Sequence, residues 1–407
     1  MHGRKRQYTI RVLTFSALGL LVAAGVYWWL RPSWSGSQGA PAVGTNPPAA
    51  HDNSQLGFAA ASTFSEADAA AEGCRPGAVI VNDPTDPAMD RKLAARIEAA
   101  REGFQAALIQ STDNREQALG LMLQSAAATS ARHADNPETL DELAQLAQGS
   151  GDPAVYEIAL LTCQRAKAGS GATSCESLSA SKWSEIDSDN AVPWLTLASE
   201  ASQLHDTVNE ATDFHQAAVA HRFENYGDSL LAIAQPAESK DLTPLEQYYL
   251  NAEVIGAASA MVLPYARAAR DCDSANSGNW DASADCWAIA ERMVASGGSL
   301  IQFGIGIRMG ERSGWPGQLL SDLKREHAAL IMLALGSPRD LTSVQSCHEA
   351  IREMERAKRW SAIGEVAALR AELPLSGQSE EDLAAQYEQW NARFKSTGKP
   401  PSNPSSR

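Results

Sequence analysis

Residues 136–153 read NPETLDELAQLAQGSGDP and contain one complete helical unit of this chain. Asn136 followed by proline predicts a helix start, because asparagine can accept a bond from a free backbone N–H and proline needs no N–H in the first turn. Gly, Ser and Asp then interrupt the helical pattern before Asp152 and a second proline begin the next helix. Such short loops predict antiparallel neighbouring helices. The apolar residues at helical spacing are Leu140, Leu143 and Leu146.

The same start signal recurs along the chain. Asp86 and Thr243 each precede a proline. The start at Asp86 predicts a helix that runs to about Gln110. Alanine is frequent, whereas the alternation of Val, Ile and Thr that is typical of strands is almost absent. We therefore expect an all-α fold of roughly twelve to fifteen helices. They would form stacked antiparallel hairpins, arranged either as an α-solenoid or as an irregular helical bundle.

A last helix is expected over residues 379–395, with Ser379 as its cap and acidic residues in its first turn. Its apolar residues lie at i, i+4, i+7 and i+11 and form one face. Because an exposed face of this size is unfavourable in water, we expect it to dock on the main domain or on a partner. The residues of this face are Leu383, Tyr387, Trp390 and Phe394.

One stretch contains an aromatic residue, a leucine and a small residue in a first predicted helix. An aromatic residue and a small residue follow in a second predicted helix. These residues are Trp194, Leu197, Ala198, Phe214 and Ala217. At this spacing residues 187–220 resemble one tetratricopeptide repeat, a unit of about 34 residues that folds as two antiparallel helices. The resemblance implies small residues where the helices approach and aromatic residues between hairpins. It covers one repeat only, and three positions depart from the family pattern: Ala201, Glu210 and Arg222.

Residues 12–30 form a run of 19 residues without a charge. At about 1.5 Å per residue this run nearly spans the hydrocarbon core of a membrane. It ends in Tyr27, Trp28 and Trp29, which suit the membrane interface. Four basic residues precede it, so the positive-inside rule places residues 1–11 in the cytoplasm and the rest outside it. The alternative is a cleaved signal peptide, whose apolar core is usually shorter.

The remaining domain boundaries follow from composition. Residues 31–62 are rich in Pro, Gly, Ser and Ala and predict a disordered linker. Residues 63–374 form the expected helical domain, and residues 375–407 the amphipathic helix and a disordered tail. We expect a single-pass protein of the inner membrane whose helical domain lies in the periplasm.

The formal net charge of −15 bears on partners. All basic residues of the first 30 positions precede the anchor, so the exported part is more acidic than the whole chain. Such a surface repels phosphate backbones, and we therefore expect no nucleic-acid partner. A simpler explanation is that the charge keeps the domain soluble.

Six cysteines all lie in the exported part, where an oxidising compartment permits disulfides. Cys163 and Cys175 flank a Gly/Ser loop, and Cys272 and Cys286 flank an Asp/Asn/Gly loop. Pairing each local couple leaves a third pair, Cys74 with Cys347. Some of these cysteines would otherwise be small buried apolar groups.

No pattern of catalytic, metal or cofactor residues meets its chemical requirements. His205, His215 and His221 are not spaced to share a helix face, and no cysteine pair has zinc-finger spacing, so we expect no metal. Glycines 304, 306 and 310 lie inside a helical pattern rather than after a strand, which favours close helix packing over a dinucleotide site. Residues 120–124, GLMLQ, resemble a lytic transglycosylase motif with one inserted leucine, and the candidate Glu176 lies on the wrong side of it.

These observations favour a membrane-tethered adaptor that binds another envelope protein or peptide, with no cofactor and no catalytic residue. The alternative is an envelope enzyme acting on cell-wall material through an unrecognised site. A transmembrane sensor is a third class, but a stub of 11 residues leaves no output domain in the cytoplasm.

Overall fold

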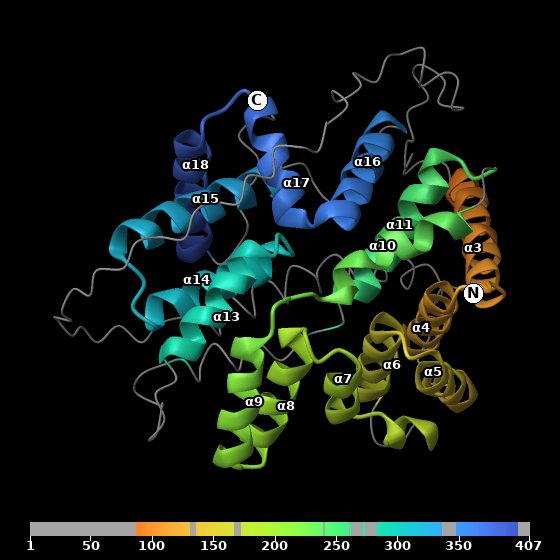
Figure 1. Ribbon diagram of the computed structural model, residues 1–407. Coiled ribbons are helices and arrows are strands. Elements are labelled where there is room, and N and C mark those ends of the chain that lie inside the picture. The colour runs from red at the N-terminus through yellow and green to blue at the C-terminus, as the bar shows by residue number, and fades with distance from the viewer. Residues whose placement is uncertain are drawn as a thin grey trace. The chain divides into compact units, whose positions relative to one another are not determined.

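The computed structural model describes residues 87–130, 136–166, 172–238, 241–259, 261, 272, 283–335 and 347–397. Within these ranges the chain forms fifteen α-helices and four short 3-10 helices and no β-strand (Figure 1). The all-α prediction is therefore confirmed. None of the helices in these ranges is both long enough and apolar enough to cross a membrane. The predicted anchor at 12–30 and linker at 31–62 lie outside the described residues.

The α-helices of the described ranges are between 5 and 23 residues long. They are α3 (Pro87–Ile109), α4 (Asn114–Ser130), α5 (Pro137–Ser150), α6 (Pro153–Ala166), α7 (Ala180–Ile186), α8 (Ala191–Gln203), α9 (Thr207–Val219), α10 (Leu230–Ala234), α11 (Pro244–Ser259), α13 (Ser283–Ala295), α14 (Leu300–Arg312), α15 (Gly317–Leu335), α16 (Cys347–Ile363), α17 (Glu365–Glu372) and α18 (Glu380–Thr397). The 3-10 helices are η1 (Ser174–Ser177), η2 (Tyr226–Ser229), η3 (Gln235–Ala237) and η4 (Leu373–Leu375).

The predicted helix starts are confirmed, and the caps that lie within the described residues have the expected geometry; Asp86 lies outside them. The Asn136 side chain accepts a bond from the backbone N–H of the second residue of α5 at 3.1 Å. Asp152 does the same for α6 at 2.8 Å. Before α11, the Glu246 carboxylate accepts the backbone N–H of Thr243 at 2.8 Å, which completes a reciprocal cap. Ser379 caps α18 by accepting a bond from the third helical N–H at 3.1 Å.

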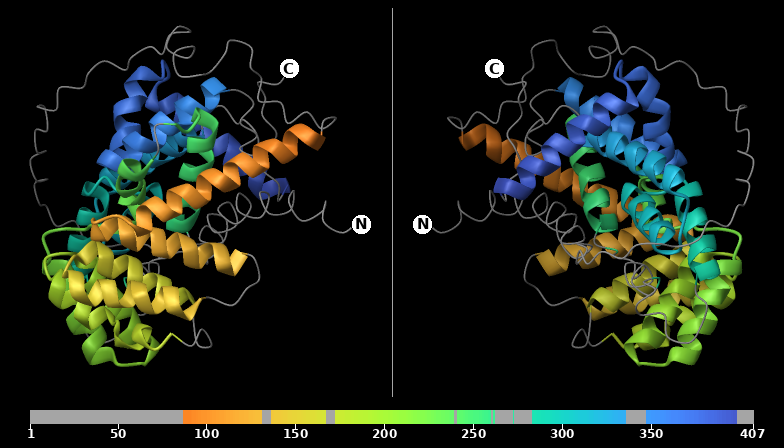
Figure 2. Two further views of the ribbon diagram at one scale, coloured as in Figure 1. Left: turned by 90° about the vertical axis from the view of Figure 1, so that its right-hand side faces the viewer. Right: turned by 90° about the vertical axis from the view of Figure 1, so that its left-hand side faces the viewer.

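Helices that follow one another in sequence pack side by side from α3 to α9. The order then changes, because α9 packs on α13 and not on α10. From there α13, α14, α15 and α18 are successive neighbours, and α17 packs on α14 and α15. Helix α16 connects α17 to α11, and α11 lies beside α3, which Figure 2 shows as green and orange helices side by side. The series of packed helices therefore closes on itself: it begins at α3 and comes back to α3 through α16 and α11.

The short segment formed by η2 and α10 lies between these two series of helices. It contacts α4 and α6 on one side and α11 and α16 on the other. The surrounding core is continuous and includes fully buried aromatic side chains from separate helices: Tyr156, Trp183 and Phe214. The backbone of η2 contacts the buried carboxylate of Glu157 in α6, and its Tyr226 hydroxyl contacts the buried carboxylate of Asp187 in the loop after α7.

Three glycines of α14 allow neighbouring groups to approach its backbone. A Cβ atom on Gly304 would lie 2.8 Å from His327 Cε1, and one on Gly306 would lie 2.9 Å from Met293 Cβ. Gly310 is similarly covered by the indole of Trp315. The glycine run therefore serves helix packing, as the helical pattern indicates, and its residues do not follow a strand.

Candidate functional site

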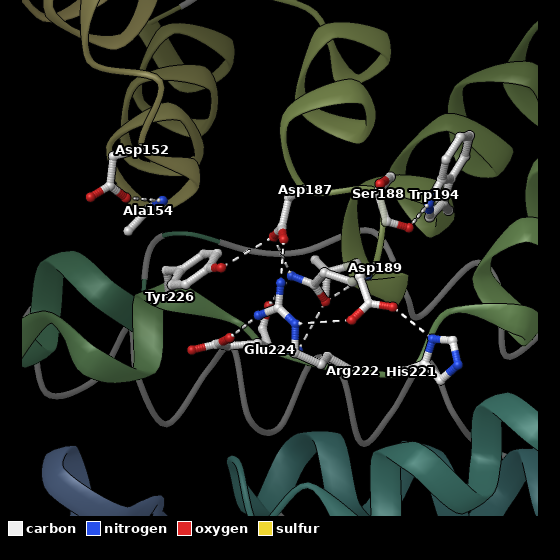
Figure 3. Close-up of polar contacts among 12 residues, drawn as sticks. Asp152, Ala154, Asp187, Ser188, Asp189, Trp194, His221, Arg222, Glu224 and Tyr226 are labelled. Carbon is white, nitrogen blue, oxygen red and sulfur yellow. Dashed lines mark hydrogen bonds and ion pairs between the residues drawn. The ribbon is translucent and has the colours of Figure 1, made fainter.

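The most extensive polar cluster in the described residues joins two loops at the base of the α8–α9 hairpin (Figure 3). One loop connects α7 to α8, and the other connects α9 to η2. We call this cluster the Arg222 network. Its members are Asp187, Asp189, Asn190, His221, Arg222, Glu224 and Tyr226.

Asn190 is the centre of the Arg222 network and is completely buried. Its side-chain oxygen accepts the backbone N–H of Val192 at 3.3 Å and that of Glu224 at 3.0 Å. Its side-chain nitrogen donates to Asp187 Oδ2 at 2.8 Å and to the carbonyl oxygen of Glu224 at 2.9 Å. All the hydrogen-bonding capacity of the amide is used. Asn190 therefore caps α8 and holds the two loops together.

Asp187 is also buried, with 2% of its side chain exposed. Arg222 Nη2 donates to Asp187 Oδ1 at 2.6 Å, and the Tyr226 hydroxyl donates to Asp187 Oδ2 at 3.2 Å. Burial raises the pKa of Tyr226 above its usual value, so the hydroxyl keeps its proton and remains a donor. The buried negative charge is thus compensated by a cation and by neutral donors, as Figure 3 shows.

The outer edge of the Arg222 network is exposed. His221 Nδ1 lies 2.7 Å from Asp189 Oδ1, and this contact holds the pKa of Asp189 below its usual value. Arg222 also contacts Glu224 and lies 3.6 Å from Asp189. Every charged group of the cluster therefore has a partner within the chain. This arrangement stiffens the base of the hairpin and presents no unpaired group for chemistry.

A second group of polar residues comprises three carboxylates around η2: Glu157, Asp228 and Glu365. Glu157, in the middle of α6, is completely buried, and burial raises its pKa to about 8. Its two oxygens accept the backbone N–H groups of Gly227 at 3.2 Å and Tyr226 at 3.3 Å. These bonds favour the ionised form and limit the rise of the pKa.

The other two carboxylates bind adjacent backbone N–H groups at the start of α14. Burial, assisted by the charge of Glu365, raises the pKa of Asp228 to about 7, and Asp228 accepts the N–H of Ser299. Glu365 accepts the N–H of Leu300 at 2.8 Å, and burial raises its pKa as well. Both side chains therefore sit at the positive end of a helix dipole and repel each other there.

No sequence pattern predicts either polar group, because their members are far apart in the chain. The only local signal is Glu157, a single acidic residue inside the apolar run VYEIALL at 155–161. An isolated acidic residue in such a run indicates a buried carboxyl group that needs hydrogen-bond partners, but it does not say which ones.

The three histidines near the hairpin have separate surroundings. His215 Nδ1 lies 3.1 Å from Asp285 of α13, while His221 belongs to the Arg222 network. His205 is exposed and adopts a left-handed backbone with φ 58°. Among the described residues no group of three or more His, Cys, Asp or Glu side chains could hold a metal ion.

The residues that resemble a tetratricopeptide repeat lie on α8 and α9, which form an antiparallel hairpin. Ala198, Phe214 and Ala217 are buried in the core. Trp194 and Leu197 are only half-buried, and the neighbouring Leu195 takes the core position on α8. The indole N–H of Trp194 donates to the carbonyl oxygen of Ser188 at 2.9 Å.

The apolar face of α18 meets α15 at one end. Leu383 packs with Ala328 and Ala329, and Tyr387 lies partly buried beside them. Further along, Trp390 stacks with Tyr387 and with Phe394 at ring distances of 6.1 Å and 5.6 Å. Trp390 and Phe394 are half-buried.

Both local disulfides are confirmed. Cys163 of α6 pairs with Cys175 of η1 with their Cα atoms 5.6 Å apart, and Cys272 pairs with Cys286 of α13 at 5.8 Å. The third expected pair lies outside the described residues, since it requires Cys74 and the side chain of Cys347.

The segment that resembles a lytic transglycosylase motif belongs to the core. Leu121, Met122 and Leu123 of α4 are fully buried, and Leu108 and Ile109 closely cover Gly120. Glu176 lies exposed in η1. The leucine run is thus accounted for by packing. No protein-family model, curated protein or solved structure matches this chain.

Proposed function

We propose that this protein is a membrane-tethered adaptor that presents its helical domain to another protein of the cell envelope. The observation that carries the proposal is the turn between α8 and α9. Leu204 and Val208 are 79% and 74% exposed there, the highest values among the large apolar side chains described. Exposed apolar side chains that lie close together are a feature of protein contact surfaces.

The surroundings of this turn support the proposal. The Arg222 network fixes the base of the hairpin, so the tip is held on a preorganised element, which lowers the entropic cost of binding. The polar groups of that network satisfy one another within the chain. The charge-free run at 12–30 and the linker at 31–62 would supply the tether.

Crosslinking in intact cells tests the adaptor function. Formaldehyde treatment of cells that produce the full chain at its native level should yield discrete heteromeric adducts. The control is the same treatment after the envelope has been dissolved in denaturant. If adducts are absent at native levels, the adaptor proposal is wrong.

A protease added outside the inner membrane should also digest the helical domain, and protection of the whole chain would contradict the proposed topology.

A second candidate function is that of an envelope enzyme acting on cell-wall glycan. One observation favours it: Asp228 and Glu365 are neighbouring carboxylates with raised pKa values, and such pairs perform general acid–base catalysis. Both carboxylates also accept backbone N–H bonds at the start of α14, which is a sufficient structural reason for their position. Release of soluble glycan from isolated cell walls by the full chain, lost in Asp228→Asn and in Glu365→Gln, would support the enzyme.

A further inference from the structure

The two most exposed large apolar side chains of the described residues lie four positions apart in one turn. Leu204 directly follows α8 as its C-cap, and Val208 lies in the first turn of α9. Between them His205 adopts the left-handed conformation that reverses the chain. The Asp206 side chain then caps α9 by accepting the N–H of Asn209 at 3.2 Å. The turn is therefore an ordered structure that holds its apolar side chains outward.

The hairpin below this turn contains acidic residues but no lysine or arginine. From Trp183 to His221 the sequence contains seven acidic residues and no lysine or arginine. Four of the acidic residues belong to the hairpin itself: Glu200, Asp206, Glu210 and Asp213. Several carboxylates elsewhere in the described ranges are paired across helices, for example Glu380 with Arg325 and Glu326 with Arg370.

The hairpin carboxylates repel one another. Burial and the charge of Asp213 raise the pKa of Glu200, and burial and the charge of Asp206 raise the pKa of Asp213. The two arginines that contact this region lie at its other end. Arg222 binds Asp187, and Arg292 of α13 donates to the carbonyl oxygen of Ala218. In the described residues the tip therefore combines exposed apolar side chains with negative charge that no cation offsets.

We propose that the tip of the α8–α9 hairpin is the docking surface of the adaptor, and that its partner is a cationic amphipathic segment of another protein. Leu204 and Val208 would contact the apolar side chains of that segment, and Glu200, Glu210 and Asp213 its lysines or arginines. This assignment rests on the adaptor function proposed above. Charge complementarity decides the class of partner, since opposite potentials across an interface speed association and exclude partners of the wrong sign.

The same charge argues against other occupants of this surface. A second copy of the chain would bring an identical acidic hairpin against the first, and like charges at an interface are strongly unfavourable. Anionic lipid headgroups and nucleic acids would be repelled for the same reason. A segment with apolar and basic side chains at helical spacing satisfies both features of the tip.

Site-specific photocrosslinking in intact cells tests the proposal with the full chain. A benzophenone amino acid replaces Leu204 or Val208, and matched controls carry it at Val219, at the base of the same hairpin, or at Leu375, which is 72% exposed on η4. We expect adducts from positions 204 and 208 and at least about threefold less from the two controls. The crosslinked peptide, identified by mass spectrometry, should contain more Lys and Arg than Asp and Glu.

Charge variants test the electrostatic part of the proposal. The variant Glu210→Gln/Asp213→Asn should reduce the adduct at position 204 at least about threefold. The control Glu138→Gln/Glu142→Gln removes the same charge from exposed positions of α5 and should leave the adduct unchanged.

Three outcomes would overturn the assignment: an acidic or neutral crosslinked peptide, a peptide from a second copy of this chain, or equal loss of the adduct in both charge variants. If positions 204 and 208 give no adduct while formaldehyde still captures a partner, the docking surface is wrong and the adaptor function stands. If formaldehyde captures nothing either, the adaptor function itself is wrong.

Discussion

The carboxylate of Glu157, completely buried in α6, accepts the backbone N–H of Gly227 at 3.2 Å, a residue 70 positions further along the chain. This bond and its neighbour to Tyr226 attach η2 to α6. Because burial raises the pKa of Glu157 to about 8, the protein carries a titratable group in its core within the physiological pH range.

The first prediction concerns the pH dependence of stability. An unfolded glutamate titrates near 4.5, and the folded Glu157 near 8, so its contribution is fully present at low pH and is lost as the pH rises through that window. The titration of Glu157 by itself should remove up to about 5 kcal/mol of the free energy of unfolding between these limits, and the raised pKa of Asp228 adds a loss of the same sign. Denaturant unfolding of the full chain from pH 5 to pH 8 measures this loss.

Glu157→Gln is the test variant for this effect. Its amide offers one acceptor oxygen where the carboxyl group offers two, so it should be less stable than the wild type at pH 5. Its stability should vary less with pH, and the difference from the wild type should shrink toward pH 8. Parallel curves for the two proteins would show that Glu157 does not titrate in this range.

The second prediction concerns Asn190, whose side chain makes four hydrogen bonds while completely buried. Asn190→Ala should destabilise the protein by about 2–4 kcal/mol, because it leaves buried partners without hydrogen bonds. Asn209→Ala is the control, since Asn209 is exposed and, within the described residues, its side chain donates to Asp206 alone. Thermal unfolding compares the two variants, and equal shifts would contradict a central role for Asn190.

The third prediction concerns the disulfide between Cys163 and Cys175, which closes a loop across a sequence separation of 12. Replacing both cysteines with serine should lower the free energy of unfolding by roughly 3 kcal/mol.

In protein isolated from the envelope without reductant, with free thiols blocked first, peptide mapping should recover the Cys163–Cys175 and Cys272–Cys286 bridges. Full alkylation of Cys163 and Cys175 would disprove the first bridge.

The fourth prediction concerns the packing of α14. Gly304→Ala should destabilise the protein by about 1–3 kcal/mol, because its Cβ would displace His327. That ring donates from Nε2 to the carbonyl oxygen of Leu300 at 3.0 Å, and burial lowers its pKa. Gly103→Ala in α3 is the matched control: a Cβ there meets nothing within 4 Å, so it should stabilise by about 0.5–1 kcal/mol. Equal effects would show that close packing does not require Gly304.

Several features of this protein were readable from sequence because they depend on neighbours in the chain. Asn136 and Ser379 cap the helices that their sequence patterns predict, since a cap needs only its own side chain and the next few N–H groups. The two local disulfides were readable for a related reason. A short loop with turn residues brings its ends together whatever the rest of the fold does.

Other features were decided only by tertiary structure. Helix propensity does not say that α9 packs on α13, nor that Leu195 and not Trp194 takes the core position on α8. The pKa of a carboxylate depends on burial, on hydrogen bonds and on the charges around it, and for Glu157 the hydrogen bonds come from a segment about 70 residues away. The sequence therefore determined the helices and the loops that join them. The contacts between distant helices decided which polar groups are buried together and which apolar side chains remain exposed.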